Sequence, residues 1–121
     1  MIEKNRVMAE AYYQAMSDRD VSRIEKYLHP DVELISPLAM VTGKEAVLES
    51  IKRFMQFFLH LTVRTSFGSE TQAMLAYNVT IPAGLMRAAV LMTFKDNLIA
   101  SIDLFYDTKL VEEKKTEIFS K

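Results

Sequence analysis

The segment Asp18–Pro37, DRDVSRIEKYLHPDVELISP, constrains the fold more than any other part of the chain. Asp20 is of a residue type that caps helices, and a short helix can follow it. The dipeptide His29-Pro30 ends that helix, because the residue before a proline is pushed out of the helical region. Residues 32–36 then alternate as a strand, and the next proline restricts that strand to a sheet edge or its end. The segment therefore predicts a short helix that turns directly into a strand.

A longer helix is predicted on each side of this segment. After residue 43 a second amphipathic helix is expected to run to about Leu59, because Thr42 and Glu45 have the spacing of a capping box. Before the segment, apolar side chains recur at the spacing of one helix face; they are Met8, Ala11, Tyr12, Ala15 and Met16.

Four strands are predicted for the rest of the chain, over residues 61–67, 71–80, 85–94 and 98–106. Gly68-Ser69, residues 81–84 and residues 95–97 provide the turns between them. The order of elements indicates an α+β fold. We expect a curved, mixed or antiparallel sheet that wraps around the long N-terminal helix, with two further helices and a cone-shaped cavity open at one end.

Length and composition restrict the class of protein. A chain of 121 residues is expected to form a single domain over residues 1–121, with residues 108–121 as a polar tail. The net charge of −1 gives no basic surface for nucleic acid. No apolar run is long enough for a membrane span, and no signal peptide is evident, so a cytoplasmic protein is expected. With no cysteine and two histidines far apart in the sequence, the chain predicts no metal site and no cofactor.

The order of elements resembles the nuclear transport factor 2-like superfamily, also called cystatin-like, and within it the SnoaL-like polyketide cyclases and the ketosteroid isomerases. The resemblance extends from about Val7 to Asp107. It depends on the turn at Asp20, the Pro30-Asp31 pair, Gly43 and the turn DNLI at residues 96–99. These motifs indicate a fold, and this fold supports many unrelated functions.

Comparison with the ketosteroid isomerases implies roles for some residues. Tyr12 matches their tyrosine on the first helix, which donates a hydrogen bond to the developing enolate oxygen. Tyr106 matches an aromatic residue that lines their pocket. Two tyrosines that support the donor in those enzymes correspond here to Leu28 and Ile51. The resemblance thus implies one hydrogen-bond donor without its usual support.

The same comparison argues against the isomerase reaction. The general base of those enzymes is an aspartate before a proline, and Ser36 occupies that position. Their second oxyanion donor corresponds to Val90, which has no polar group. A serine without an adjacent base cannot remove a proton from carbon near pH 7. Arg87 and Asp103 are predicted to lie on the opposite face of the sheet, so the Asp-Arg-Asp arrangement of related epoxide hydrolases is not evident either.

The sequence therefore predicts binding of a small apolar molecule, with no catalytic residue assigned. Pockets for such molecules have volumes of roughly 300–1,000 Å³ and a few placed polar groups. The eight methionines favour an adaptable interior. The expected ligand-binding residues are Tyr12, Met16, Ser36, Met40, Phe54, Met86, Val90, Met92, Ile102 and Tyr106.

Two alternatives remain open at this point. One is an isomerase or cyclase that acts on a steroid-like or polyketide-like substrate with Tyr12 as donor. That reading needs an acid or base in the cavity, and His60 and Glu70 are its candidates. The other is an interaction module that forms a homodimer through the outer face of the sheet, where apolar side chains are also expected; they are Leu85, Ala89, Leu91, Ile99 and Phe105.

Overall fold

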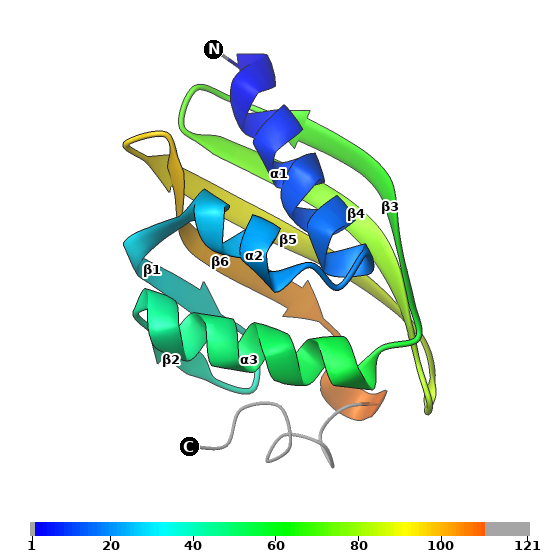
Figure 1. Ribbon diagram of the computed structural model, residues 1–121. Helices are drawn as coiled ribbons and strands as arrows, with labels where there is room; N and C mark the ends of the chain where they lie inside the picture. The colour runs from blue at the N-terminus through cyan, green and yellow to red at the C-terminus, as the bar shows by residue number, and fades with distance from the viewer. Residues whose placement is uncertain (1, 111–121) are drawn as a thin grey trace.

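The computed structural model describes residues 2–110 and contains three α-helices and one six-stranded sheet (Figure 1). Most of the predicted polar tail lies outside the described residues; its first three residues form a 3-10 turn, η1. In chain order the elements are α1 (Ile2–Ser17), α2 (Val21–Tyr27), β1 (Leu28–Ile35), β2 (Met40–Thr42), α3 (Lys44–Phe57), β3 (His60–Gly68), β4 (Gln72–Ile81), β5 (Gly84–Lys95), β6 (Leu98–Tyr106) and η1 (Thr108–Leu110).

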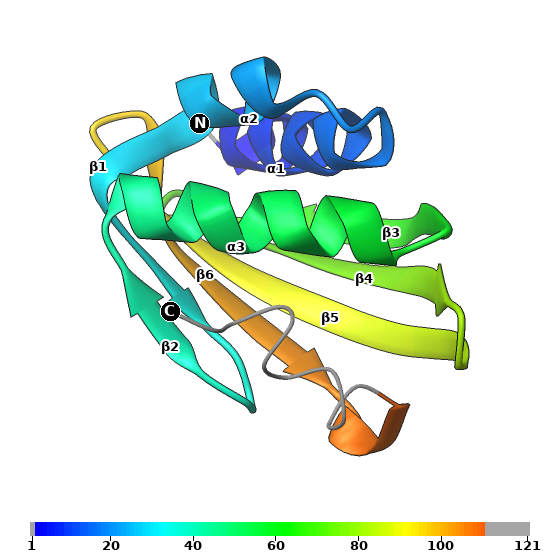
Figure 2. The same ribbon diagram turned by 60° about the horizontal axis from the view of Figure 1, so that its bottom comes forward.

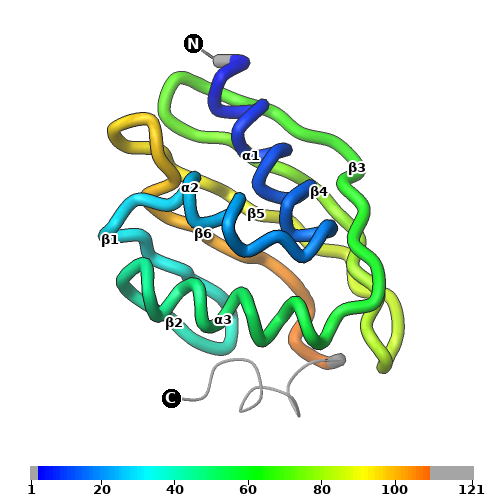
Figure 3. Tube along the Cα trace, in the orientation of Figure 1, coloured from blue at the N-terminus to red at the C-terminus, as the bar shows by residue number. Residues whose placement is uncertain are grey.

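The sheet is mixed and strongly curved. Its strand order is β2-β1-β6-β5-β4-β3; β1 pairs with β6 in parallel and the other pairs are antiparallel. All three helices lie on the concave face, as Figure 2 shows. Helix α1 packs on β3 and β4, and α3 packs on β1 (Figure 3). This α+β architecture confirms the predicted fold class, and no helix within residues 2–110 lies on the opposite face of the sheet.

Three local predictions need correction. Leu28 is the first residue of β1, so the helix ends at Tyr27, before the His29-Pro30 break. The three-residue strand β2 was not predicted, because its pairing with β1 depends on a partner strand and not on its own short sequence. The capping box is absent: the N-cap of α3 is Gly43, at φ +96°, and Thr42 belongs to β2. Glycine adopts this backbone conformation without strain.

A bulge near the start of β6 changes which side chains face the helices. Ile99 pairs with Phe94, whereas Ser101 pairs with Thr93, so Ala100 is an extra residue in the ladder. An extra residue shifts the alternation of side chains by one. Ile99 is therefore fully buried on the concave face, and its predicted place on the outer face was wrong.

Polar contacts fix α1 over the sheet at both of its ends. Near its N-terminus, the Asn5 amide donates to the backbone oxygens of Ser69 and Glu70, at 3.0 Å each. After its C-terminus, the Arg19 guanidinium donates to the carbonyls of Met55 (3.0 Å) and Phe58 (2.5 Å). These four hydrogen bonds join α1 to the β3–β4 turn and to the end of α3.

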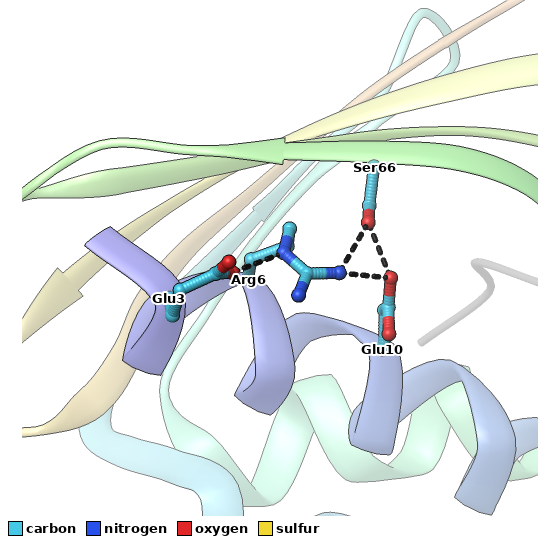
Figure 4. A network of polar contacts seen from close by, with 4 residues as sticks. All are labelled: Glu3, Arg6, Glu10 and Ser66. Atoms are coloured by element: carbon cyan, nitrogen blue, oxygen red, sulfur yellow. Dashed lines mark hydrogen bonds and ion pairs between the residues drawn. The ribbon is translucent and has the colours of Figure 1, made fainter. Parts of the chain in front are cut away.

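A third contact lies along the middle of α1 (Figure 4). Arg6 forms ion pairs with Glu3 (2.5 Å) and Glu10 (3.0 Å) on the same helix. Ser66 of β3 hydrogen-bonds to Glu10, so the network reaches from the helix to the sheet edge. Within residues 2–110 no helix is long and apolar enough to cross a membrane.

Candidate functional site: an apolar cavity beneath α1 and α3

An apolar cavity of about 70 Å³ lies between α1, α3 and the concave face of β4–β6. Its walls are aliphatic, thioether and aromatic side chains, and the polar groups among them are four tyrosine hydroxyls and one serine. Within residues 2–110 no charged side chain lines it. The lining residues are Tyr12, Tyr13 and Met16 of α1, Leu34 of β1, Ser50, Ile51 and Phe54 of α3, Tyr77 and Val79 of β4, Met86 and Ala88 of β5, and Ile102, Leu104 and Tyr106 of β6.

The cavity exists because of one row of side chains across the sheet. Tyr77 pairs with Ala88, and Ala88 pairs with Tyr106 in the neighbouring strand. Strands lie about 4.8 Å apart, so the two tyrosine positions are roughly 10 Å apart. The methyl group of Ala88 is too small to fill the space between two phenol rings. Ala88 therefore forms the floor, and the tyrosines form two opposite walls.

Three tyrosines form a packed cluster at the closed end of the cavity. The ring of Tyr13 meets that of Tyr12 edge-on, with centroids 5.0 Å apart and planes at 78°. On its other side Tyr13 lies against Tyr77, at 4.7 Å and 37°. Each of these side chains is at least 95% buried. Such contacts fix the orientation of the rings, and with it the position of their hydroxyl groups.

Burial controls the ionisation of this cluster. Removal of the anionic form from water raises the pKa of Tyr12 and Tyr13 well above the usual value, and raises that of Tyr77 to about 12. A hydrogen bond between the hydroxyls of Tyr13 and Tyr77 further raises the pKa of Tyr13 and lowers that of Tyr77. All three phenols are thus neutral throughout the physiological range.

Tyr106 lines the cavity and is only partly buried, and it contacts Ser36. Partial burial raises the pKa of Tyr106, and a hydrogen bond with Ser36 opposes the rise. The Ser36 hydroxyl accepts from the backbone N–H groups of Leu38 and Ala39, at 3.2 Å each, and donates to the Ala39 carbonyl at 3.1 Å. Ser36 therefore closes the β1–β2 turn and reaches the cavity through Tyr106.

Six of the ten residues predicted to bind a ligand line this cavity: Tyr12, Met16, Phe54, Met86, Ile102 and Tyr106. Four do not. Ser36 is held in its turn, and Met40 lies on the edge strand β2, 66% exposed. Val90 and Met92 face the concave side as their parity predicts, but they are fully buried further along β5 and do not reach the cavity.

The structure adds lining residues that the sequence did not single out, above all Tyr13, Tyr77 and Ala88. Tyr77 alternates with other buried residues of β4, and that alternation was visible in the sequence. The sequence does not show the strand register, and it is the register that places Tyr77 opposite Ala88. Tyr13 follows Tyr12 on the helix, and only the packing shows that both rings point to the sheet.

The candidate acids and bases lie elsewhere. His60 is exposed at the start of β3, and Glu70 is exposed in the β3–β4 turn. Arg87 and Asp103 are on the outer face, as predicted from strand parity. His29 is in β1, where its ring nitrogen Nδ1 accepts from the Asp31 N–H at 3.0 Å. None of these side chains lines the cavity.

The fold and this site define a helix-lined, curved-sheet domain with one apolar cavity. A model of the SnoaL-like domain family matches residues 9–102, so the chain belongs to this family. A search of curated proteins gave no match.

Solved structures share the fold at low identity. A steroid delta-isomerase from Pseudomonas aeruginosa is 16% identical with a TM-score of 0.80, over 93% of this chain and 88% of that one. An NTF2-like protein of unknown function from Cytophaga hutchinsonii is 16% identical with a TM-score of 0.78, over 87% and 91%. A bacterial protein with a cystatin-like fold from Silicibacter pomeroyi is 16% identical with a TM-score of 0.78, over 93% and 80%. At this identity the likeness concerns the fold alone.

Proposed function

We propose that this protein binds a small, neutral, apolar molecule in the cavity over Ala88. The observation that carries the proposal is an apolar cavity whose lining, within residues 2–110, has no charged side chain. An apolar ring that buries about 150 Å² gains on the order of 4 kcal/mol, which corresponds to a dissociation constant near 1 mM. Additional contacts outside the closed part would strengthen this affinity.

The volume limits the size of the ligand. A cavity of about 70 Å³ is smaller than the range expected for sites of this kind. A four-ring steroid does not fit in it without movement of the walls. Met16 and Met86 line it, and methionine side chains adapt their shape easily. The proposed ligand is therefore a single ring with small substituents, with any further part extending past Tyr106, which is only partly buried.

Binding can be tested with ethylbenzene, a single apolar ring that needs Met16 and Met86 to move aside. We expect the methyl NMR signals of Met16 and Met86 to shift on titration. Ala88→Leu should abolish the shifts, because its side chain fills the floor of the cavity. Ala89→Leu is the matched control: the neighbouring residue points to the outer face, and its variant should bind normally. Equal binding by both variants would refute the proposed site.

An isomerase or cyclase with Tyr12 as donor gains no support from the site. Such a reaction needs a group that takes a proton, and no carboxylate or imidazole lines the cavity within residues 2–110. We therefore place binding ahead of catalysis.

A second role, homodimer formation, is favoured by the outer face of the sheet. One register row crosses all six strands there and consists of Phe67, Met74, Leu91, Asp103, Ile35 and Met40. Phe67 and Met40 are each 66% exposed, and Met74 is 41% exposed. Five of the six side chains in this row are apolar and the sixth is Asp103; within residues 2–110 no helix covers this face, so the row suits a second copy of the same sheet. We propose this face as the dimer interface.

The dimer is tested by size-exclusion chromatography with light scattering at low micromolar concentration. We expect the mass of two chains, and Met74→Lys should reduce it to one by placing a charge between Phe67 and Leu91 in the row. Lys in place of Thr62, at the exposed edge strand β3, should leave the mass unchanged. A wild-type mass of one chain would exclude the interface.

A further inference from the structure

The exposed apolar side chains of this protein gather on the convex face of the sheet. Seven large apolar side chains are exposed within residues 2–110, and five of them point outward from the sheet on this face. A contiguous apolar patch on a protein surface marks an interaction site. A partner that covers this patch also covers the charged groups within it. The five side chains are Met40, Phe67, Met74, Leu85 and Phe105.

Asp103 is a charged group in the middle of this face. Its register partners on the two neighbouring strands, Leu91 and Ile35, are both apolar, and its own side chain is already partly buried. Within residues 2–110 its carboxylate forms no ion pair. Burial of an unpaired carboxylate is strongly unfavourable. A partner that covers Asp103 must therefore bring a cation to it.

Arg87 is the matching cation on the same face. It points outward from β5, is exposed, and forms no ion pair within the described part of the chain. The carboxylate of Asp107, which follows the end of β6, accepts the backbone N–H of Lys109 at 2.9 Å. Arg87 lies four residues before Leu91, the register partner of Asp103, so the Cα atoms of Arg87 and Asp103 are roughly 14 Å apart. The two side chains cannot pair within one chain at this distance, but two copies can pair them with each other.

A two-fold axis satisfies both charges of both copies at once. In an isologous dimer, residue i of one copy contacts residue j of the other, and j contacts i. Asp103 of each copy then meets Arg87 of the other, and the axis passes between the two sheets midway between these positions. Ala89 and Phe105, a register pair, lie midway. Each of these two residues therefore faces its own counterpart across the interface.

We propose that two copies of this chain pack convex face to convex face in one register, with Asp103 of each copy paired with Arg87 of the other and with Ala89 and Phe105 at the two-fold axis. This inference rests on the dimer proposed above and adds its register and the charge pair that specifies it. An apolar face alone permits many packings. Other registers leave the two carboxylates covered and unpaired, so the ion pairs select this one.

Charge reversal tests the pairing. Asp103→Arg places two cations opposite each other, and Arg87→Asp places two anions opposite each other. Each variant alone should raise the dissociation constant of the dimer by roughly a hundredfold or more, and so give the mass of one chain at low micromolar concentration. The double variant Asp103→Arg/Arg87→Asp restores both pairs with the charges exchanged, and it should be a dimer again.

A mixture of the two single variants gives a sharper test. In a heterodimer of Asp103→Arg with Arg87→Asp, each of the two contacts again joins one cation and one anion. We expect an equimolar mixture to form this heterodimer, although neither variant dimerises alone. Native mass spectrometry distinguishes the heterodimer from both homodimers by mass.

Single cysteines locate the axis, because the chain has no cysteine of its own. Ala89→Cys should link two copies when a short bismaleimide is added, since residue 89 faces its own counterpart. Thr93→Cys is the matched control, because it lies on the same face of β5 four residues further along. It is roughly 25 Å from its counterpart in the proposed register, so it should not be linked.

The outcomes separate the dimer from its register. A wild-type mass of one chain refutes the proposed dimer, and this inference with it. If the wild type is a dimer and either single reversal stays dimeric, only the pairing is wrong. The same holds if neither the double variant nor the mixture dimerises, or if Thr93→Cys is linked and Ala89→Cys is not. Circular dichroism checks the fold of every variant, and should a charge reversal not fold, the two cysteine variants decide.

Discussion

Arg19 has a left-handed backbone, at φ +55°, in the turn between α1 and α2. The contacts of its side chain offset the free-energy cost of that backbone conformation. The guanidinium donates two hydrogen bonds to carbonyls at the end of α3 and lies 4.3 Å from the ring centroid of Phe58. The last carbonyls of a helix lack partners within it, and a cation is favoured there. One residue thus closes a turn and caps a distant helix.

We predict that Arg19→Lys lowers the free energy of unfolding by about 1–2 kcal/mol, because an ammonium cannot make both hydrogen bonds in this planar geometry. Chemical denaturation measures the change. Arg23→Lys is the matched control: Arg23 pairs with Asp18 at the surface, so its replacement should have little effect. Equal effects from the two variants would contradict the capping role of Arg19.

Ser36 occupies the position where the resemblance implies a base, and its hydroxyl is used by the turn and by the hydrogen bond with Tyr106. We predict that Ser36→Ala costs about 1–2 kcal/mol of stability, because two backbone N–H groups lose their acceptor. Ser36→Asp should recover only part of this loss at neutral pH, since a carboxylate can accept from both N–H groups but cannot donate to the Ala39 carbonyl. Thermal unfolding of the two variants in parallel tests this. If Ser36→Ala melts at the wild-type temperature, the turn does not depend on the hydroxyl.

At the scale of elements, α1 is the component that closes the cavity. Asn5, 7% exposed, binds two carbonyls of the β3–β4 turn, while Tyr12, Tyr13 and Met16 further along the helix line the cavity. The hydrogen bonds at the start of the helix therefore hold the cavity wall in place.

We predict that Asn5→Asp destabilises the protein more than Asn5→Ala at pH 7, by about 1 kcal/mol, because a carboxylate facing two carbonyl oxygens is worse than no group at all. The difference should shrink as the pH falls below about 4, where a protonated carboxyl can donate one hydrogen bond. Hydrogen exchange of the α1 amides should accelerate in both variants. An Asn5→Asp variant that is as stable as the wild type at pH 7 would contradict the assigned donor role.

Much of the element order could be predicted from the sequence, because amphipathic spacing and turn residues are local signals. The helices, the strand at residues 32–36 and the four later strands were found in this way. The strand β2 and the bulge at Ala100 could not be, since both depend on pairing with another strand. The same limit applies to the site. The parity of Tyr77 was visible, but its place opposite Ala88 and against Tyr13 is a consequence of register and packing.

At the scale of the whole molecule, the curved sheet separates two apolar surfaces with different roles. The concave face is covered by the three helices and contains the cavity, whereas no helix of the described part of the chain lies over the convex face (Figure 2). Both faces are largely apolar along β5, where Met86, Ala88 and Val90 lie on the concave face and Leu85, Ala89 and Leu91 share the convex face with Arg87. A strand that is apolar on both faces is typical of a sheet buried on both sides. The fold therefore supplies one covered face, and the proposed dimer supplies the other.

The tyrosine cluster makes global stability depend on pH in the alkaline range. Tyr12, Tyr13 and Tyr77 have raised pKa values in the folded state, that of Tyr77 near 12, against an unfolded value of about 10. Between these values the unfolded chain binds fewer protons than the folded one, so stability falls as the pH rises. In this range each tyrosine lowers the free energy of unfolding by about 1.4 kcal/mol per pH unit, and the three together lower it by roughly 4 kcal/mol per pH unit.

We predict cooperative unfolding within about two pH units above pH 10, because a domain of this size has only about 5–15 kcal/mol of stability to lose. Tyrosinate absorbance from the cluster should appear together with the loss of circular dichroism, and stability below pH 10 should not depend on this ionisation. In Tyr12→Phe the slope of stability against pH should decrease by about a third, since one of three linked ionisations is removed. Ionisation of all five tyrosines in protein that keeps its native circular dichroism would show that the cluster is open to water. Such a result would contradict both the closed end of the cavity and the selection for neutral ligands that depends on it.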